Sequence, residues 1–323
     1  MSPSLPVIII VTPYLAKANN GNWRTAHRWQ SLLSGEFKVI VQGDWQDEAC
    51  DMLIALHARR SAEVIRRFRN RHPQTPLVVV LTGTDLYKDL ATSADAQRSL
   101  TLADALIVLQ EDAIQHVPLD CRKKTHIVYQ SAKTLAPATK PHDRLNCVVV
   151  GHLRAEKDPD TVFRAVEALP AAAPIHVLHL GAPLDSELAA KATSLGQRRQ
   201  NYRYAGALAH GLTRAAIKRA HLLIHPSVME GGANVIVEAL SSGTAVLASR
   251  MSGNVGMLGA DYPGYFPVGD DAALAQLLLR CTEDANFLSR LNVACKARAK
   301  LFLPLTERIS LGHIANDLLA RSR

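Results

Sequence analysis

Short apolar runs rich in valine, isoleucine and leucine alternate with helical patterns along most of this chain, and this alternation restricts the possible folds more than any other feature. In the first half the expected strands are 7–11, 38–41, 52–56, 77–81, 105–109 and 126–129, and the expected helices are 23–33, 61–70 and 94–102. The runs lack period-two alternation, which is typical of strands buried on both faces of a parallel sheet. We therefore expect an α/β domain with helices on both faces of its sheet.

A second series follows after a break at 131–143, where two prolines and no apolar periodicity indicate an interdomain linker. Its expected strands are 146–150, 175–180, 222–225 and 245–248, and its expected helices are 159–169, 185–195, 212–220 and 233–241. We expect two Rossmann-like doubly wound domains, over 1–135 and 145–300, which face each other across a cleft that holds the site. Residues 301–323 are expected to form a C-terminal helix that could pack back on the first domain.

The charge and composition restrict the partners. The chain of 323 residues carries a net charge of +8, which favours anionic ligands. The basic clusters Arg66–Arg71, Arg122–Lys124 and Arg198–Arg199 are expected to be solvated faces. Aromatic residues make up only 5% and do not interleave with basic ones, so we expect no nucleic-acid partner.

Cysteine spacing and hydropathy suggest a cytoplasmic protein. The cysteine count of 5 is odd and shows no C-x-x-C pair, so we expect neither a zinc site nor a disulfide framework. The apolar run at 7–11 is too short for a signal-peptide core. No stretch approaches the roughly 20 apolar residues of a membrane helix, so we expect no integral membrane segment.

The segment 225–250 (HPSVMEGGANVIVEALSSGTAVLASR) carries the strongest chemical signal. It starts at the end of an expected buried strand, and a helix is expected from about residue 233. Gly231 and Gly232 let backbone N–H groups approach a ligand closely. The free N–H groups of a helix start suit a diphosphate. We therefore expect a phosphate-bearing ligand beside this loop.

Two glutamates frame the same segment. Glu238 lies eight residues after Glu230 and shares a helix face with Asn234. Carboxylates accept hydrogen bonds from sugar hydroxyls, so the two glutamates could grip two sugars of one nucleotide. The alternative is a capping glutamate and a surface glutamate on an ordinary helix. That alternative fits Glu238 less well, because apolar residues surround it in the sequence.

The spacing E-x7-E, followed by ALSSGTAVLAS, resembles the signature of retaining GT-B glycosyltransferases of the family 4 type. The resemblance implies a GT-B fold with an acceptor-side first domain and a second domain that binds a nucleotide sugar. It implies that Glu230 contacts the donor sugar and that Glu238 contacts the ribose hydroxyls. It also implies that no metal and no other cofactor is required.

A second block, VVVGHLRAEKDP at 148–159, resembles the family's V-G-R-L-x-x-x-K-G, whose Arg and Lys hold the donor diphosphate. Lys157 matches the Lys of this pattern. His152 stands at the Arg position, and Arg154 follows two residues later. The resemblance therefore assigns the diphosphate to Lys157 and Arg154, whereas His152 is either a neutral hydrogen-bonding group or a structural residue.

The loop after the first strand resembles the family's acceptor-side loop, with Asn20-Gly21 in place of its two glycines. Gly21, Asn22 and Arg24 are the residues expected to act there. The alternative is a simple connection, although about ten residues is longer than the two to six that are usual.

Two further loops follow strands of the first domain and carry His57, Thr84 and Asp85. The resemblance implies that His57 contacts the donor sugar, with a structural role as the alternative. Asp85 could cap a helix, bind an acceptor or act as a base, and Thr84 is expected on the acceptor side. We list His57, Asp85 and Glu230 as catalytic candidates.

Six blocks together most closely resemble the selenosugar synthases of selenoneine biosynthesis: GNWRTAHRW, ALHARRSA, LTGTDLYKDL, VVGHLRAEKDP, HPSVMEGGANVIVEAL and SRMSGNVGMLGADYPGYFPVGD. This resemblance implies UDP-N-acetylglucosamine as donor and selenophosphate as acceptor. Selenium would attack the anomeric carbon to give a 1-seleno sugar. Two alternatives remain: a family-4-like transferase with a hydroxyl acceptor, and a UDP-sugar epimerase on the same fold.

Overall fold

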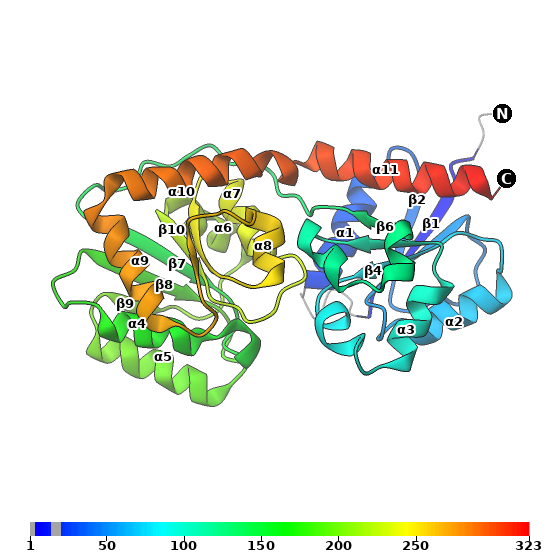
Figure 1. The fold of residues 1–323 in the computed structure, drawn as a ribbon. Coiled ribbons are helices and arrows are strands. Elements are labelled where there is room, and N and C mark those ends of the chain that lie inside the picture. Colours follow the sequence, from blue (N-terminus) through cyan, green and yellow to red (C-terminus); the bar gives the residue numbers. More distant parts are fainter. Residues whose placement is uncertain (1–3, 14–20, 323) are drawn as a thin grey trace. The chain divides into compact units, whose positions relative to one another are not determined.

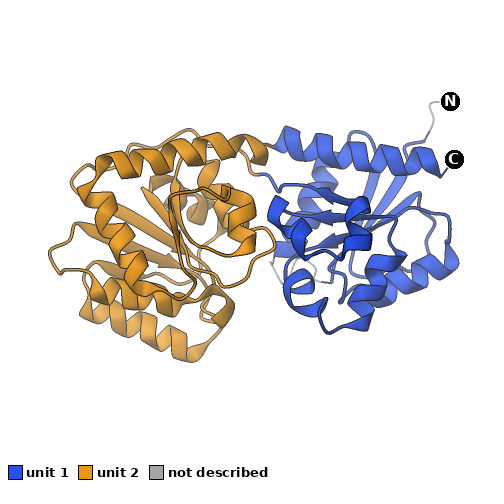
Figure 2. Cartoon of the chain, in the orientation of Figure 1, with its two compact units in different colours: residues 1–131, 304–323 blue, residues 132–303 orange. Residues whose placement is uncertain are grey.

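The computed structural model describes residues 4–13 and 21–322 and divides the chain into two compact units. Unit 1 contains residues 1–131 and 304–323, and unit 2 contains residues 132–303 (Figure 2). Each unit is built on one parallel sheet of six strands. The expected fold class, two Rossmann-like α/β domains of the GT-B type, is confirmed.

The sheet of unit 1 has the order β2-β1-β3-β4-β5-β6, and every neighbouring pair is parallel (Figure 1). Its strands are β1 (Val7–Val11), β2 (Lys38–Gln42), β3 (Met52–Leu56), β4 (Leu77–Leu81), β5 (Ala105–Val108) and β6 (Thr125–Ile127). The strand order reverses between β1 and β3, and such a switch point is where open α/β sheets bind ligands.

Helices cover both faces of this sheet because alternate strand residues point to opposite sides. Ile8 and Ile10 of β1 belong to the core under α1 (Gly21–Leu33) and α11 (Pro304–Arg321). Ile9 belongs to the core under α2 (Ala62–Arg71) and α3 (Ala94–Leu102). The C-terminal helix therefore packs beside α1, in the first unit (Figure 1).

One buried carboxylate fixes α11 to this unit. Glu307 is 1% exposed and accepts hydrogen bonds from Arg28 Nε at 2.9 Å and from Trp29 Nε1 at 2.7 Å. It also accepts the Ser131 N–H at 2.8 Å. A buried charge requires such partners, because desolvation would otherwise make it unfavourable.

The sheet of unit 2 has the order β12-β11-β10-β7-β8-β9 and is also parallel throughout (Figure 1). Its strands are β7 (Leu145–Val150), β8 (Ile175–Leu180), β9 (Tyr202–Tyr204), β10 (Leu222–His225), β11 (Ala245–Ser249) and β12 (Tyr265–Phe266). The chain leaves β7 towards β9 and then returns to β10, so the switch point lies between β7 and β10.

The α-helices of unit 2 connect these strands and extend beyond them. They are α4 (Pro159–Ala168), α5 (Ser186–Arg198), α6 (His210–Arg219), α7 (Asn234–Leu240), α8 (Ser252–Leu258), α9 (Asp271–Glu283) and α10 (Ala285–Arg298). Among the helices of the described residues, none is long and apolar enough to cross a membrane.

The expected linker has no regular secondary structure, but unit 2 holds it along its surface. The Leu135 N–H donates to Ser241 O at 2.9 Å, and Lys140 Nζ donates to Gly243 O at 2.9 Å. Strands β9 and β12 and helix α8 were not among the elements expected from the sequence. Helix α1 begins at Gly21, two residues before the expected start at residue 23.

Candidate functional site

Two loops meet at the switch point of unit 2, one after β7 and one after β10. The Val228 N–H of the second loop donates to Glu156 O of the first at 3.0 Å. A side chain at position 253, at the start of α8, would collide with the carbonyl oxygen of Glu230. Gly253 therefore allows a close approach that fixes the Glu230 backbone, which gives a structural reason for glycine in the SGN stretch.

Lys157 and Glu230 form an ion pair across these two loops. Lys157 lies in the short 3-10 helix Ala155–Lys157, and its ammonium contacts Glu230 Oε1. Their side chains are only 20% and 14% exposed. The two residues expected to bind the diphosphate and the donor sugar thus lie in direct contact.

His225 ends β10 directly beside this pair. Its ring is buried, and Nε2 lies 3.5 Å from Glu230 Oε1. Burial, with a contribution from the charge of Lys157, lowers the pKa of His225 to about 4. Burial raises the pKa of Glu230, but the charge and the hydrogen bond of Lys157 outweigh that effect, so its pKa lies below the usual value. Glu230 is therefore an ionised carboxylate at neutral pH.

Glu238 lies inside α7, and its side chain is 10% exposed. His210, the first residue of α6, lies with Nε2 2.7 Å from Glu238 Oε1. Helices α6 and α7 pack together, which brings these residues into contact across 28 positions of sequence. The geometry holds the carboxylate in one orientation, as a sugar-hydroxyl acceptor requires.

The other expected donor-site residues lie on the same loops. Arg154 is half exposed, and its Nε lies 3.9 Å from Glu156 Oε2. Gly231 and Gly232 lie between Glu230 and the start of α7, and Asn234 is the first residue of that helix. His152 Nδ1 accepts the Ala182 N–H at 3.0 Å. That bond ties the ends of β7 and β8 and favours the structural interpretation of His152.

In unit 1 the structure brings His57, Thr84 and Asp85 together. His57 follows β3 beside the switch point and has a φ of 74°. Residues other than glycine seldom adopt this conformation, and it often marks a functional site. His57 Nε2 lies 3.1 Å from Thr84 Oγ1, and Nδ1 lies 3.9 Å from Asp85 Oδ2.

Asp85 is fully buried, and backbone N–H groups surround its carboxylate. Oδ2 accepts the Ala58 N–H at 2.9 Å, and Oδ1 accepts those of Thr82 and Gly83 at 2.9 and 2.8 Å. It also begins the short π-helix Asp85–Asp89. The geometry gives this carboxylate a positioning role for the two loops that carry His57 and Thr84.

The expected acceptor-side residues Gly21, Asn22 and Arg24 lie in the first turns of α1 rather than in a loop. Thr25 Oγ1 donates to Gly21 O at 2.9 Å, which holds Gly21 in helical geometry. Asn20, expected to share the turn with Gly21, lies outside the described residues. The site residues thus form two groups, one in each unit.

Two histidines beside the expected glutamates received no role in the sequence analysis. A polar residue that ends the buried run LLIH was the available signal for His225. His210 has no such signal, because only the packing of α6 on α7 brings it to Glu238.

Partners within the fold hold most of the three basic clusters. On α2, Arg66, Arg67, Arg69 and Arg71 pair with Glu63, Asp44, Asp104 and Asp47. Arg122 and Lys124 donate to backbone carbonyls, Arg198 pairs with Glu167, and Arg199 donates to Leu169 O. These contacts favour the expected solvated faces over docking sites.

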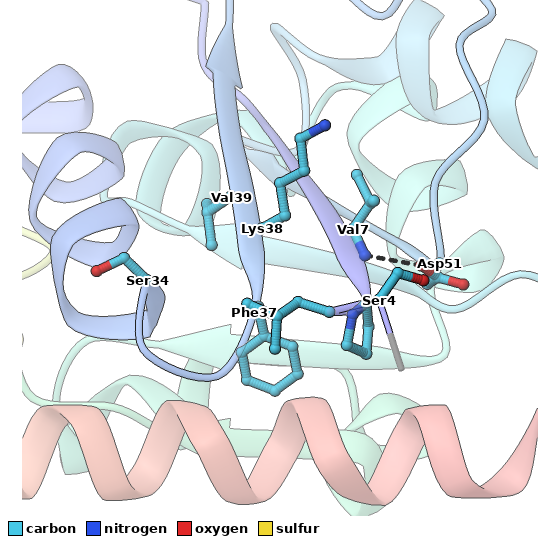
Figure 3. A pocket seen from close by; sticks show the side chains of 9 residues that line it. Ser4, Val7, Ser34, Phe37, Lys38, Val39 and Asp51 are labelled. Atoms are coloured by element: carbon cyan, nitrogen blue, oxygen red, sulfur yellow. Dashed lines mark hydrogen bonds between the residues drawn. The ribbon is translucent and has the colours of Figure 1, made fainter. Parts of the chain in front are cut away.

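A hollow of about 800 Å³ lies at the opposite end of the unit 1 sheet, around the first residues of β1 and β2 (Figure 3). Its lining includes Phe37, Lys38 and Asp51, and Asp51 accepts the Val7 N–H at 2.7 Å. The amino ends of parallel strands are not where such folds bind ligands. We therefore assign no function to this hollow.

Comparison with solved structures shows the same architecture in several proteins. Sucrose-phosphate synthase from Thermosynechococcus elongatus has a TM-score of 0.79 at 17% identity, over 98% of this chain and 100% of that chain. HepE from Anabaena, solved in complex with UDP, has a TM-score of 0.73 at 15% identity, over 96% and 99%. The pneumococcal O-GlcNAc transferase GtfA, solved with UDP and GlcNAc, has a TM-score of 0.66 at 19% identity, over 83% and 57%. These identities show similarity of fold alone.

Sequence comparison gives the family. No curated protein sequence matches this chain at a significant level. The family model described as glycosyl transferases group 1 matches residues 131–300, slightly more than half of the chain. That match covers both loops at the switch point of unit 2. The chain therefore belongs to the glycosyl transferases group 1 family.

Proposed function

We propose that this chain transfers N-acetylglucosamine from UDP-N-acetylglucosamine to selenophosphate, in the cytoplasm, to give a 1-seleno sugar for selenoneine biosynthesis. The Lys157–Glu230 pair at the switch point of unit 2 carries the donor half of this proposal. HepE and GtfA, which share the fold, were solved with UDP bound. The six sequence blocks carry the acceptor half.

In this proposal the donor spans the two loops of unit 2. Lys157 and Arg154 contact the diphosphate, and Glu238, held by His210, accepts the ribose hydroxyls. Glu230 accepts hydroxyls of the donor sugar, which its ionised state allows. Gly231 and Gly232 give the diphosphate access to the backbone, and Asn234 faces the same ligand from the start of α7.

The acceptor half uses unit 1. The selenium of selenophosphate attacks the anomeric carbon, the bond from that carbon to the diphosphate oxygen breaks, and UDP leaves with the bonding electrons. Hydrolysis of the Se–P bond then releases phosphate and the 1-seleno sugar. Selenophosphate is already anionic, so the step requires no deprotonating base. Asp85 is therefore not needed as a base. This agrees with its contacts, because its carboxylate accepts hydrogen bonds from three backbone N–H groups.

His57 is the proposed sugar contact in unit 1, with Thr84 as its neighbour and Asp85 as the group that positions both. Gly21, Asn22 and Arg24 at the start of α1 are the proposed acceptor-side residues, because α1 follows β1 at the switch point of that sheet. Positive side chains on the acceptor side and on the donor side would stabilise the charge of two phosphate groups in the transition state.

The test is UDP release from UDP-N-acetylglucosamine with and without selenophosphate, with the sugar product identified by mass spectrometry. The proposal predicts selenophosphate-dependent UDP and a hexosamine that contains selenium. UDP released only with a hydroxyl acceptor would contradict the acceptor assignment. Conversion of the UDP-sugar to its epimer without release of UDP would instead indicate an epimerase.

A further inference from the structure

His225 lies beside the Lys157–Glu230 pair, and one of its ring nitrogens makes no hydrogen bond to the described residues. The residue is 1% exposed, and its Nε2 is buried without a hydrogen-bond partner among the described residues. The nearest acidic oxygen is Glu230 Oε1 at 3.5 Å, the same oxygen that the ammonium of Lys157 contacts. Two nitrogens therefore lie beside the same carboxylate oxygen, one in contact with it and one 3.5 Å away.

Lys157 Nζ and His225 Nε2 differ in how easily they can move away from Glu230 Oε1. Lys157 has a flexible stem of four carbons, and its charge can turn to another anion. The backbone of Glu230 is held in place, because Gly253 approaches its carbonyl closely and the Val228 N–H bonds to Glu156 O on the neighbouring loop. A bound diphosphate would attract Lys157 and leave the carboxylate in a largely buried place without its cation.

We propose that His225 is a positioning residue that replaces Lys157 as the partner of Glu230 when Lys157 turns to the donor diphosphate. This inference rests on the proposed function, since it assumes a nucleoside diphosphate beside Lys157. A shift of about 0.5 Å brings Nε2 to ordinary hydrogen-bond distance of Oε1. The exchange keeps Glu230 ionised and oriented towards the sugar throughout binding.

The exchange couples donor binding to the uptake of a proton by His225. The charged groups that act on the ring are Glu230, which raises its pKa, and Lys157, which lowers it. With Lys157 beside the ring and burial opposing charge, the ring is neutral at pH 7. When Lys157 leaves, the influence of Glu230 remains and the pKa of His225 rises. The complex then takes up a proton, so affinity for UDP increases as the pH falls from 7 towards 6.

The experiment is calorimetry of UDP binding to the full chain, in buffers of different ionisation enthalpy, at pH 6 and pH 8. For the wild-type chain we expect proton uptake at pH 6. His225→Phe keeps a ring but no nitrogen, and we expect about tenfold weaker UDP binding at pH 8 without proton uptake. His225→Gln retains an N–H donor and should restore most of the affinity, also without uptake. His179→Phe, which alters a buried histidine of β8 in the same unit, should leave both quantities unchanged.

The outcomes separate this inference from the proposed function. If the wild-type chain binds UDP and His225→Phe binds it with equal affinity and equal proton uptake, His225 only packs and the inference is overturned. If the wild-type chain binds no UDP at all, the proposed function fails and this inference fails with it. Should His225→Phe not fold, the imidazole carbon resonance of His225 in the wild-type chain gives the answer. We expect it to shift when UDP is added, and an unchanged resonance overturns the proposal.

Discussion

Replacing Lys157 by methionine removes the cation of the donor site and keeps the length of its side chain. The side chains of Lys157 and Glu230 are 20% and 14% exposed, so solvent screens their interaction only partly. A hydrogen bond between charged groups in such a place contributes about 2 kcal/mol. If Lys157 transfers that contact to the leaving diphosphate, its loss should lower kcat/KM about 30-fold.

The assay is steady-state UDP release, with thermal unfolding measured on the same samples. Lys191→Met is a matched control, because Lys191 is an exposed lysine of α5 that pairs with Asp160 and Glu187 in the same unit. We expect the control to retain wild-type kinetics. Adding Glu230→Gln to Lys157→Met should restore the unfolding midpoint, since it removes the unpaired buried charge, but should not restore activity.

Two results would exclude a contact between Lys157 and the diphosphate. Wild-type kcat/KM in Lys157→Met would show that the lysine does not contact the reacting donor. Loss of activity that the double substitution reverses would show that the lysine acts only by neutralising Glu230.

Three further predictions concern residues that the structure places in defined contacts. Glu307→Gln should destabilise unit 1 by about 3 kcal/mol, because Arg28, whose side chain is only 20% exposed, loses its charged partner. A chemical unfolding curve equal to that of wild type would contradict this. His210→Ala should raise KM for the UDP-sugar up to about fivefold and leave kcat unchanged, since the partner of Glu238 is half exposed and holds it in the ground state and the transition state alike; a loss confined to kcat would exclude that role. Burial lowers the pKa of His179 from 6.5 to about 4. As the pH falls from 6.5 to 4, His179 therefore becomes protonated in the unfolded chain but stays neutral in the folded chain. Stability should therefore decline over that window, by about 2 kcal/mol at pH 5 for this residue, and His179→Gln should decline less in denaturant titrations.

Hydrophobic patterning was sufficient for most of the fold. The apolar runs of β1, β3 and β4 coincide with the expected strands, because a strand covered on both faces must be apolar throughout. Strands β9 and β12 could not be predicted, because they have only three and two residues and lack an apolar run. Helix α8 could not be predicted, because its sequence SGNVGML is rich in glycine. Gly253 allows a close approach to Glu230 that no local sequence pattern reveals.

Tertiary contacts define the parts of the site that the sequence could not predict. The motif located Lys157, Glu230 and Glu238, but not the ion pair between the first two, which depends on the order of β7 and β10 in the sheet. From the sequence alone, Glu307 is expected to be a surface residue of an amphipathic helix. It is buried because α11 packs beside α1. For Asp85 the sequence left a cap, an acceptor contact and a base open. The structure surrounds its carboxylate with backbone N–H groups from two loops.

A structure of the full chain with UDP bound would test the proposed donor site. We expect the diphosphate against the Lys157 ammonium, the ribose hydroxyls on Glu238, and a hydrogen bond from His225 to Glu230 in place of the present 3.5 Å separation. UDP bound at the amino ends of the strands would exclude this donor site, and UDP bound at the switch point with the Lys157–Glu230 pair intact would exclude the exchange of partners at Glu230.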